Sequence, residues 1–323
     1  MYGTRQRFHY VHCQGCDALY QPQRLDDYSP HYPGDYYSFS TIAAGGIVNH
    51  LRAWLKTCKE RYYYLESDFI GKFLARRRPR PTYHVASHVD FRVTDSILDV
   101  GCGGGKILRE MSKVGFGNLL GIDPFIGGDL SIAPGCEIWK TSINELQTLL
   151  SARRPELAVS GFDLIMFNHS FEHVMNPESD LAAAATLLST RGKILLRIPV
   201  SDSHAFRTYG VHWVQLDAPR HVFLLSSRAI ELLASRCGLR VTQCLHDSTA
   251  FQFWGSEQYR LGIPMRSTTA YNTSIFTDEQ MAMQETKAQD LNRAGLGDQA
   301  GFVLALRKAG RCADATAWWR SYT

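Results

Sequence analysis

The sequence lacks the features of a membrane-spanning or secreted protein. No apolar run approaches the roughly 18 residues that a helix needs to cross a bilayer. The first residues, Met1 to His9, contain no apolar segment of the kind that signal peptides carry. The net charge of +4 on 323 residues is small, so the composition permits an acidic partner but does not demand nucleic acid. These absences predict a cytoplasmic protein with no transmembrane segment and no nucleic-acid partner.

Paired cysteines are also scarce. The eight cysteines are scattered, and Cys102 lies within a glycine-rich loop, which favours reduced thiols over a disulfide framework. Only Cys13 and Cys16 have the spacing of metal ligands. A structural zinc site normally needs four ligands, and the chain has no second pair. We therefore predict no metal site, with Cys13 and Cys16 as the only pair whose spacing would allow one.

The chain has no internal repeat, and its composition divides it into segments. Residues 1–40 are rich in Tyr, Pro, His and Asp and predict an irregular arm that carries the Cys13–Cys16 CxxC pair. Residues 41–85 predict a helical segment that ends in a linker, where Arg76 to Pro81 contains four arginines and two prolines. These arginines fit an anionic substrate, a membrane surface, nucleic acid, or simply a solvated helix end. Residues 86–310 predict an α/β core, and residues 311–323 a C-terminal tail.

Apolar runs that alternate with helical patterns predict a mostly parallel sheet with helices on both faces. Seven strands are expected, at residues 96–100, 118–122, 136–140, 162–167, 192–198, 239–245 and 301–307. The connection between the last two, residues 246–300, is much longer than a usual loop. It contains a polar stretch from Thr277 to Asn292 that predicts a helix. We expect this segment to form an inserted cap beside the site.

A glycine-rich loop follows the first expected strand. Residues 96–106 read SILDVGCGGGK, and glycines there let the backbone approach a ligand closely because they have no Cβ. A dinucleotide loop of the form G-x-G-x-x-G would require a glycine at Lys106. The glycines stand instead at Gly101, Gly103 and Gly105. Asp99, near the strand end, suits a cationic ligand better than a pyrophosphate.

This loop resembles motif I of the class I S-adenosylmethionine-dependent methyltransferases. The likeness continues in order, with Asp123 after the second strand, a third strand leading into Ser142, and Glu172-His173-Val174 after the fourth. It covers about residues 85–245, resumes near 301, and is similar to the type 11 and type 23 domains of polysaccharide and quinone-like biosynthesis.

The resemblance implies a Rossmann-like fold and S-adenosylmethionine as cofactor. The residues it places at the cofactor are Asp99, Gly101, Cys102, Gly103, Gly105, Asp123, Pro124, Ser142, Ile143, Asn168 and His169. Ser142 also begins the pattern Ser142-Ile-Asn-Glu145, which is a helix-capping box. Both roles are compatible, because the family uses backbone atoms in this region.

Methyl transfer to a hydroxyl usually requires a group that accepts the hydroxyl proton. Candidate catalytic residues are His169, His221, Glu172 and His173. His169 is preferred as the base, followed by His221, because the family places the reacting methyl at the end of this strand. The alternatives are that His173 only bonds to backbone and that Glu172 only caps a helix. Some quinone-pathway methyltransferases hold a divalent ion with acidic and His residues here, but His169 replaces the leading acid.

The block that ends at His221 offers candidates for binding the substrate. These are His212, Trp213, Asp217 and Arg220, although Arg220 and Asp217 are alternatively expected to pair with each other as a loop staple. The sequence thus predicts a methyltransferase that acts on a small-molecule or saccharide acceptor, most often at a hydroxyl. The alternatives are a nucleotide-dependent oxidoreductase and a non-catalytic module that binds nucleic acid or metal. No pattern indicates an oligomeric state.

Overall fold

The computed structural model describes residues 6–23, 25, 27–31, 47–65, 68–77, 89, 92–265 and 275–307. The Tyr-rich segment 32–39, the linker after Arg77 and the tail 311–323 lie outside these residues. Within them, no helix has both the length and the apolar character needed to cross a membrane.

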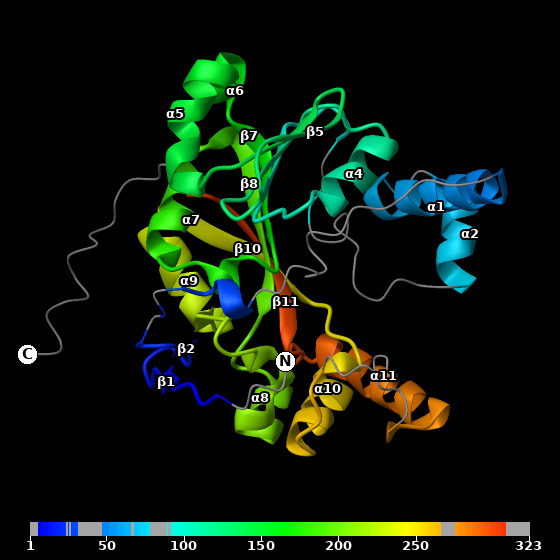
Figure 1. The fold of residues 1–323 in the computed structure, drawn as a ribbon, viewed down its shortest axis with the longest axis vertical. Coiled ribbons are helices and arrows are strands. Elements are labelled where there is room, and N and C mark those ends of the chain that lie inside the picture. The colour runs from blue at the N-terminus through cyan, green and yellow to red at the C-terminus, as the bar shows by residue number, and fades with distance from the viewer. Residues whose placement is uncertain are drawn as a thin grey trace, which may run out of the picture.

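A mixed sheet forms the centre of the molecule (Figure 1). Its strands, in spatial order β10-β11-β8-β7-β3-β4-β6-β5, have the following bounds: β3 (Ile97–Val100), β4 (Leu119–Ile122), β5 (Leu130–Ala133), β6 (Cys136–Trp139), β7 (Phe162–Asn168), β8 (Leu188–Pro199), β10 (Leu239–His246) and β11 (Gln299–Leu306). The central strands from β6 to β8 run parallel. Strands β5, β11 and β10 add antiparallel pairs at the two edges.

The seven expected strands and the α/β class are confirmed, but the central sheet has one strand more than expected. Strand β5 was missed because it is only partly buried and follows Gly127 and Gly128, so it shows no apolar run. It forms a hairpin with β6 through Gly135, whose φ is +72°. A Cβ at that glycine would lie 1.9 Å from the Gly117 carbonyl oxygen, so the turn requires glycine.

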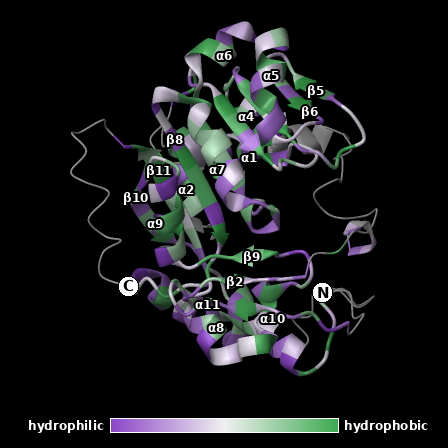
Figure 2. Ribbon diagram, turned by 90° about the vertical axis from the view of Figure 1, so that its left-hand side faces the viewer, coloured by the Kyte–Doolittle hydropathy of each residue, from purple (hydrophilic) through white to green (hydrophobic). Residues whose placement is uncertain are grey.

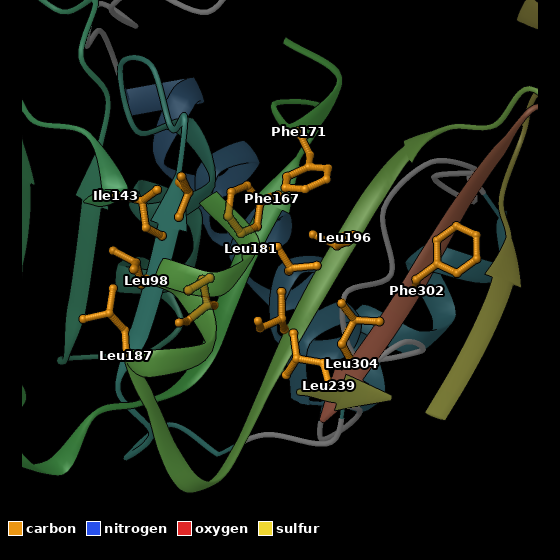
Figure 3. Packing of buried hydrophobic residues seen from close by; sticks show 14 of the residues in the cluster. Leu98, Ile143, Phe167, Phe171, Leu181, Leu187, Leu196, Leu239, Phe302 and Leu304 are labelled. Atoms are coloured by element: carbon orange, nitrogen blue, oxygen red, sulfur yellow. The ribbon is translucent and has the colours of Figure 1, made fainter. Parts of the chain in front are cut away.

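Helices cover both faces of the sheet because neighbouring strand residues point in opposite directions. In β3, Leu98 joins the larger core cluster and Ile97 joins the cluster on the other face. Figure 3 shows the larger cluster, in which Leu181 and Phe167 pack beside Leu98 and Leu196. Helices on that face are α5 (Ile143–Arg153), α7 (Pro177–Thr186) and α9 (Ser227–Arg236), while α4 (Lys106–Lys113) and α1 (Ile47–Leu65) cover the other. The short α6 (Pro155–Ser160) precedes β7, and α2 (Phe69–Arg77) packs on α1.

The cap helices gather at the end of the molecule where β7 and β8 end (Figure 1). They are α8 (His204–Tyr209), α10 (Phe251–Arg260) and α11 (Asp278–Arg293). Helix α11 agrees with the helix expected between residues 277 and 292, and Thr277 caps it by accepting a hydrogen bond from the Gln280 backbone.

The N-terminal arm, expected to be irregular, contains a small hairpin. Strands β1 (Val11–His12) and β2 (Leu19–Tyr20) pair with each other, and β2 pairs with β9 (Phe223–Leu224). A short helical turn, η1 (Ser29–His31), follows. Two-residue strands are too short to show a period, which is why the pattern did not reveal them. Figure 2 places β2 and β9 between the central sheet and the cap helices, so the arm lies beside the carboxyl ends of the parallel strands.

Candidate active site

The glycine loop connects β3 to α4 at the carboxyl edge of the sheet. Gly101, Gly103 and Gly105 all have positive φ, between 53° and 73°. A Cβ at Gly101 would lie 2.5 Å from Ser170 Cβ, and one at Gly105 would lie 2.4 Å from Ile138 Cδ1. The Ser170 hydroxyl donates to the Val100 carbonyl at 2.6 Å. The loop is therefore held between β6 and the segment that follows β7, in a shape that only glycine allows.

Two carboxylates lie beneath this loop. Asp123 follows β4, and its oxygens accept the backbone N–H groups of Gly103, at 2.9 Å, and Phe125, at 2.8 Å. Asp99 is 2% exposed, and none of the described residues hydrogen-bonds its carboxylate. Burial and then the charge of Asp123 raise the pKa of Asp99 to about 7. Two acidic residues at the loop, Asp99 and Asp123, suit a ligand that carries both a positive charge and hydroxyls, such as S-adenosylmethionine.

The other residues predicted to bind the cofactor differ in how far their side chains are exposed. Pro124 is exposed after Asp123, whereas the Cys102 side chain packs against the core below the loop. Ser142 begins α5 with the predicted capping box, in which the Glu145 carboxylate accepts the Ser142 backbone N–H at 3.3 Å; the Ser142 hydroxyl also donates to that carboxylate at 2.9 Å. Ile143 is 4% exposed in the core. Cys102 and Ile143 would therefore contribute backbone atoms to a ligand, and their side chains support the loops.

His169 follows β7 and sits in a left-handed conformation, with φ of +52°. Such a backbone is uncommon for a residue other than glycine and is found most often at functional sites. Its Nε2 lies 2.7 Å from Arg197 Nη1. Arginine can only donate, so Nε2 carries the lone pair and the ring proton is on Nδ1. Arg197 also donates to Asn168, at 3.3 Å, and pairs with Asp247, at 2.6 Å.

Glu172 lies in the turn η3 (Phe171–His173) and faces three histidines. Its side chain is 1% exposed, and neither oxygen accepts a hydrogen bond from the part of the chain that the structure describes. The Oε1 atom is 3.4 Å from His169 Nδ1 and 3.9 Å from His221 Nε2. The expected helix-capping role is therefore not what the structure gives Glu172. It is instead a buried acid at the centre of a histidine cluster.

The histidines around Glu172 have defined tautomers. His173 Nδ1 is 2.9 Å from the Arg220 carbonyl, and His221 Nδ1 is 2.7 Å from the Gln215 carbonyl. Carbonyls accept only, so both rings carry their proton on Nδ1. The Nε2 of His221 then faces Glu172 and also Asp217 Oδ2, at 3.7 Å. The Nε2 of His221 and the carboxylate oxygens of Glu172 and Asp217 are all acceptors, so the cluster is suited to bind a proton, a hydroxyl donor or a cation.

Burial and charge set the protonation of this cluster. Burial acts against charge on Glu172, but His169, His173 and His221 together lower the pKa of its carboxyl to about 2. Burial lowers the pKa of the His173 and His221 rings to about 4, although Glu172 acts in the opposite direction. At neutral pH the cluster therefore contains one carboxylate and two neutral rings.

The predicted substrate block holds the cluster in place from one side. Arg220 pairs with Asp217, as the loop-staple alternative expected, and both are buried. Burial raises the pKa of Asp217 although Arg220 opposes this shift, and its Oδ1 has no partner within the described ranges. The block includes His212 at the end of η4 (Gly210–His212) and continues through η5 (Val214–Leu216). His212 is exposed.

Trp213, also predicted to bind substrate, is fully buried. Its Nε1 donates to Asp298 at 3.0 Å, and its ring packs with Leu19 and Leu224. This burial favours a packing role over contact with a substrate.

The N-terminal hairpin supplies supports that the sequence did not reveal. Tyr10 donates from its hydroxyl to the carbonyls of His221, at 2.7 Å, and Leu216, at 2.9 Å. Gln21 donates to the carbonyls of Pro219 and His221. About 200 residues separate the partners, so no local pattern could pair them. Arg197 did leave a signal, because it is the only charged residue in the apolar run 194–199.

One group among the described residues combines ligand atoms at metal-binding distances. Atoms of Glu172, His173 and His221 all lie within 4.8 Å of one another. Two imidazoles and a carboxylate suit a divalent transition ion. Cys13 and Cys16 are close enough for their thiols to interact, but no third His, Cys, Asp or Glu of the described ranges completes a group with them.

The sequence matches a known protein family. The family described as "Methyltransferase domain" matches residues 59–244, which is more than half of the chain. Proteins named ubiquinone biosynthesis O-methyltransferase are similar to it. That of Photobacterium profundum is 30% identical over 42% of this chain and 55% of its own length. That of Stutzerimonas stutzeri is 29% identical over 57% of this chain and 80% of its own. The chain spans about half the length of most of the first curated relatives it matches.

Solved structures were also compared. A putative methyltransferase of Haloferax volcanii, in complex with the Trm112 activator, is 13% identical with a TM-score of 0.46, over 77% of this chain and 96% of that chain. A methyltransferase of Archaeoglobus fulgidus is 15% identical with a TM-score of 0.41, over 81% and 100%. The match to the family rests on the sequence of residues 59–244, which includes the glycine loop. The chain belongs to the methyltransferase domain family, among the class I enzymes that use S-adenosylmethionine.

Proposed function

We propose that this protein transfers a methyl group from S-adenosylmethionine to a hydroxyl of a small molecule. The observation that carries the proposal is the pair of His169 and Glu172 at the end of β7. His169 is 28% exposed on its side chain, whereas Glu172 is 1% exposed. An acceptor can therefore reach the histidine but not the acid.

The tautomer of His169 suits a proton acceptor. Its Nδ1 proton points toward the Glu172 carboxylate, which favours the imidazolium once a second proton arrives. The lone pair on Nε2 now accepts from Arg197, and the acceptor hydroxyl would take the place of that N–H. S-adenosylmethionine, when bound, supplies an electrophilic methyl on a sulfonium. The acceptor oxygen would take this methyl, S-adenosylhomocysteine would leave, and Nε2 of His169 would accept the hydroxyl proton.

The cofactor end would be held by the residues of the glycine loop. The Asp123 carboxylate accepts one backbone N–H on each oxygen and has further lone pairs that would accept the ribose hydroxyls, and Asp99 would face a positive charge. The demethylated product has lost the sulfonium charge, which weakens its attraction to Asp99 and favours its release.

A hydroxyl acceptor is supported by the names of the similar proteins, which are O-methyltransferases. The saccharide acceptor that the polysaccharide-type domains imply remains an alternative for the same site. A phenolic and a saccharide acceptor differ in a measurable way, because a phenol loses its proton more readily than a sugar hydroxyl. A phenolic acceptor would need less help from His169.

The experiment has two stages. Calorimetric titration of the purified chain with S-adenosylmethionine and S-adenosylhomocysteine measures donor binding, and Asp123→Ala is expected to weaken it at least tenfold. Catechols, monophenols and sugar nucleotides are then tested for methyl transfer with labelled donor. His169→Asn is expected to lower kcat by about two to four orders of magnitude and to change donor affinity far less. Donor binding without transfer to any hydroxyl acceptor would contradict O-methylation but not the cofactor.

A second role for the buried cluster is suggested by the convergence of Glu172, His173 and His221. These residues would hold a divalent ion, which would lower the pKa of a bound hydroxyl by coordinating it. Metal analysis of the purified protein, followed by activity after chelation and re-addition of Mg²⁺, Mn²⁺ or Zn²⁺, separates the two roles. A metal requirement in the parent chain, with loss of both bound metal and activity in His221→Asn, would favour the ion over the histidine base.

A further inference from the structure

Helix α2 is arranged with its large residues outward. Phe69 is 86% exposed, Phe73 51% and Ile70 42%. Gly71 and Ala75 are buried instead. Helices of water-soluble proteins normally bury their largest apolar residues, whereas α2 exposes its largest apolar residues to solvent.

The contact with α1 explains why the small residues point inward. A Cβ at Gly71 would lie 2.0 Å from the Cys58 carbonyl oxygen, so the two helices cross closely. Nothing larger than glycine fits this crossing. The aromatic residues of α2 are consequently held on its outer side by the packing, and they cannot turn into the core.

Helix α1 is itself attached to the catalytic domain. Tyr64 is 2% exposed in the core cluster of α4, where its ring meets Phe116 edge-on at 6.4 Å. Lys56 pairs with Glu110 of α4 at 3.3 Å. The outward face of α2 is therefore fixed relative to the sheet, and Figure 1 shows α1 and α2 standing out from the domain beyond α4.

Positive charge accompanies these exposed apolar residues. Lys72 and Arg76 are exposed on α2, at helical spacing from Phe69 and Phe73. The helix has no acidic residue, and the sequence adds three further arginines by residue 80. Aromatic residues flanked by Lys and Arg are the composition of helices that lie in the interface of an anionic bilayer. A protein partner would not require the charge, and nucleic acid would not require the apolar residues.

We propose that α2 docks on the surface of an anionic lipid bilayer through Phe69, Ile70, Lys72, Phe73 and Arg76, which we call the α2 face. Docking is peripheral, with the rings inserted among the acyl chains at the headgroup boundary and the two basic groups beside the phosphates. This placement goes beyond the proposed methyl transfer and does not depend on it. It would bring the enzyme to acceptors that dissolve in the bilayer.

The test is cosedimentation of the full chain with vesicles of phosphatidylcholine, with or without phosphatidylglycerol as about one third of the lipid. We expect binding to the anionic vesicles only, and weaker binding at about 0.5 M salt than at about 0.1 M. The double variant K72E/R76E should bind at least about 25-fold more weakly, because each basic residue lost costs about fivefold and each new carboxylate is repelled by the anionic surface. Phe69→Ser should also lower binding severalfold, since that ring no longer enters the interface.

Matched controls carry the same chemistry elsewhere. Val159→Ser removes an apolar side chain that is 90% exposed on α6, and Arg240→Glu reverses an exposed charge on β10. Both should bind vesicles like the parent chain. Donor titration of every variant reports whether the domain remains folded.

Three results would overturn the proposal. The first is no binding of the folded chain to anionic vesicles. The second is binding that Phe69→Ser and K72E/R76E leave unchanged. The third is salt-sensitive binding to single-stranded RNA without binding to vesicles, which would assign the basic residues to nucleic acid.

Discussion

The glycine loop makes a stability prediction that the structure allows to be worked out. In Gly105→Ala, the new Cβ would lie 2.4 Å from Ile138 Cδ1 at a backbone φ of +71°. The left-handed backbone costs about 1–2 kcal/mol for alanine, of which about 0.4–1 kcal/mol is offset by the stiffer unfolded chain. Overpacking against the buried Ile138 adds about 1–3 kcal/mol.

Gly238→Ala is the matched control for the backbone term. Gly238 has φ of +72°, and a Cβ there would meet no atom within 4 Å. The difference between the two variants in the free energy of unfolding therefore isolates the contact with Ile138. We expect Gly105→Ala to be the less stable of the two by about 1–3 kcal/mol in urea unfolding.

Ile138→Val completes the cycle, because it removes the Cδ1 atom that the new methyl would meet. Alone it should destabilise by about 0.5–1.5 kcal/mol. Combined with Gly105→Ala it should recover about 1 kcal/mol relative to the sum, and it should recover part of the donor affinity that a displaced loop loses. Equal destabilisation by Gly105→Ala and Gly238→Ala, or a coupling of zero, would show that Ile138 does not define the loop.

Three further predictions concern charge and support. Burial and then the charge of Asp123 raise the pKa of Asp99 to about 7, so a cationic donor should bind more tightly as pH rises from 6 to 8. Calorimetry in two buffers would detect the proton that Asp99 releases on binding. Asp99→Asn should abolish this pH dependence. Burial lowers the pKa of His173 and His221 to about 4, so between pH 6.5 and 4 the unfolded chain binds more protons than the folded chain. The free energy of unfolding should therefore fall on acidification, by about 3 kcal/mol per ring. Unfolding of His221→Asn should show a smaller fall, and an unchanged slope would contradict the burial of a neutral ring. Tyr10→Phe removes a hydroxyl that bonds two carbonyls and should lower the free energy of unfolding by about 1–3 kcal/mol, measured by thermal or urea unfolding. An effect near zero would mean that the hairpin does not support the cluster.

The strands and the loop could be predicted because their signals are local. Leu98, Leu120 and Phe167 lie in short apolar runs that only a sheet covered on both faces would bury. The glycines at 101, 103 and 105 lie within five residues, and their spacing, which leaves Lys106 where a dinucleotide loop has glycine, argues against a dinucleotide. Strand β5 and the N-terminal hairpin escaped prediction, because their strands are short or half exposed and show no period.

The environment of the catalytic candidates could not be read from the sequence. His169, Glu172 and His173 are adjacent in the chain, but His221 reaches Glu172 only because the turn before β9 folds back onto η3. Arg197 sets the tautomer of His169 from another strand. The residue types and the order of elements follow from local pattern. The partners of each ionisable group, and therefore its protonation, depend on contacts between segments that only the packed chain brings together.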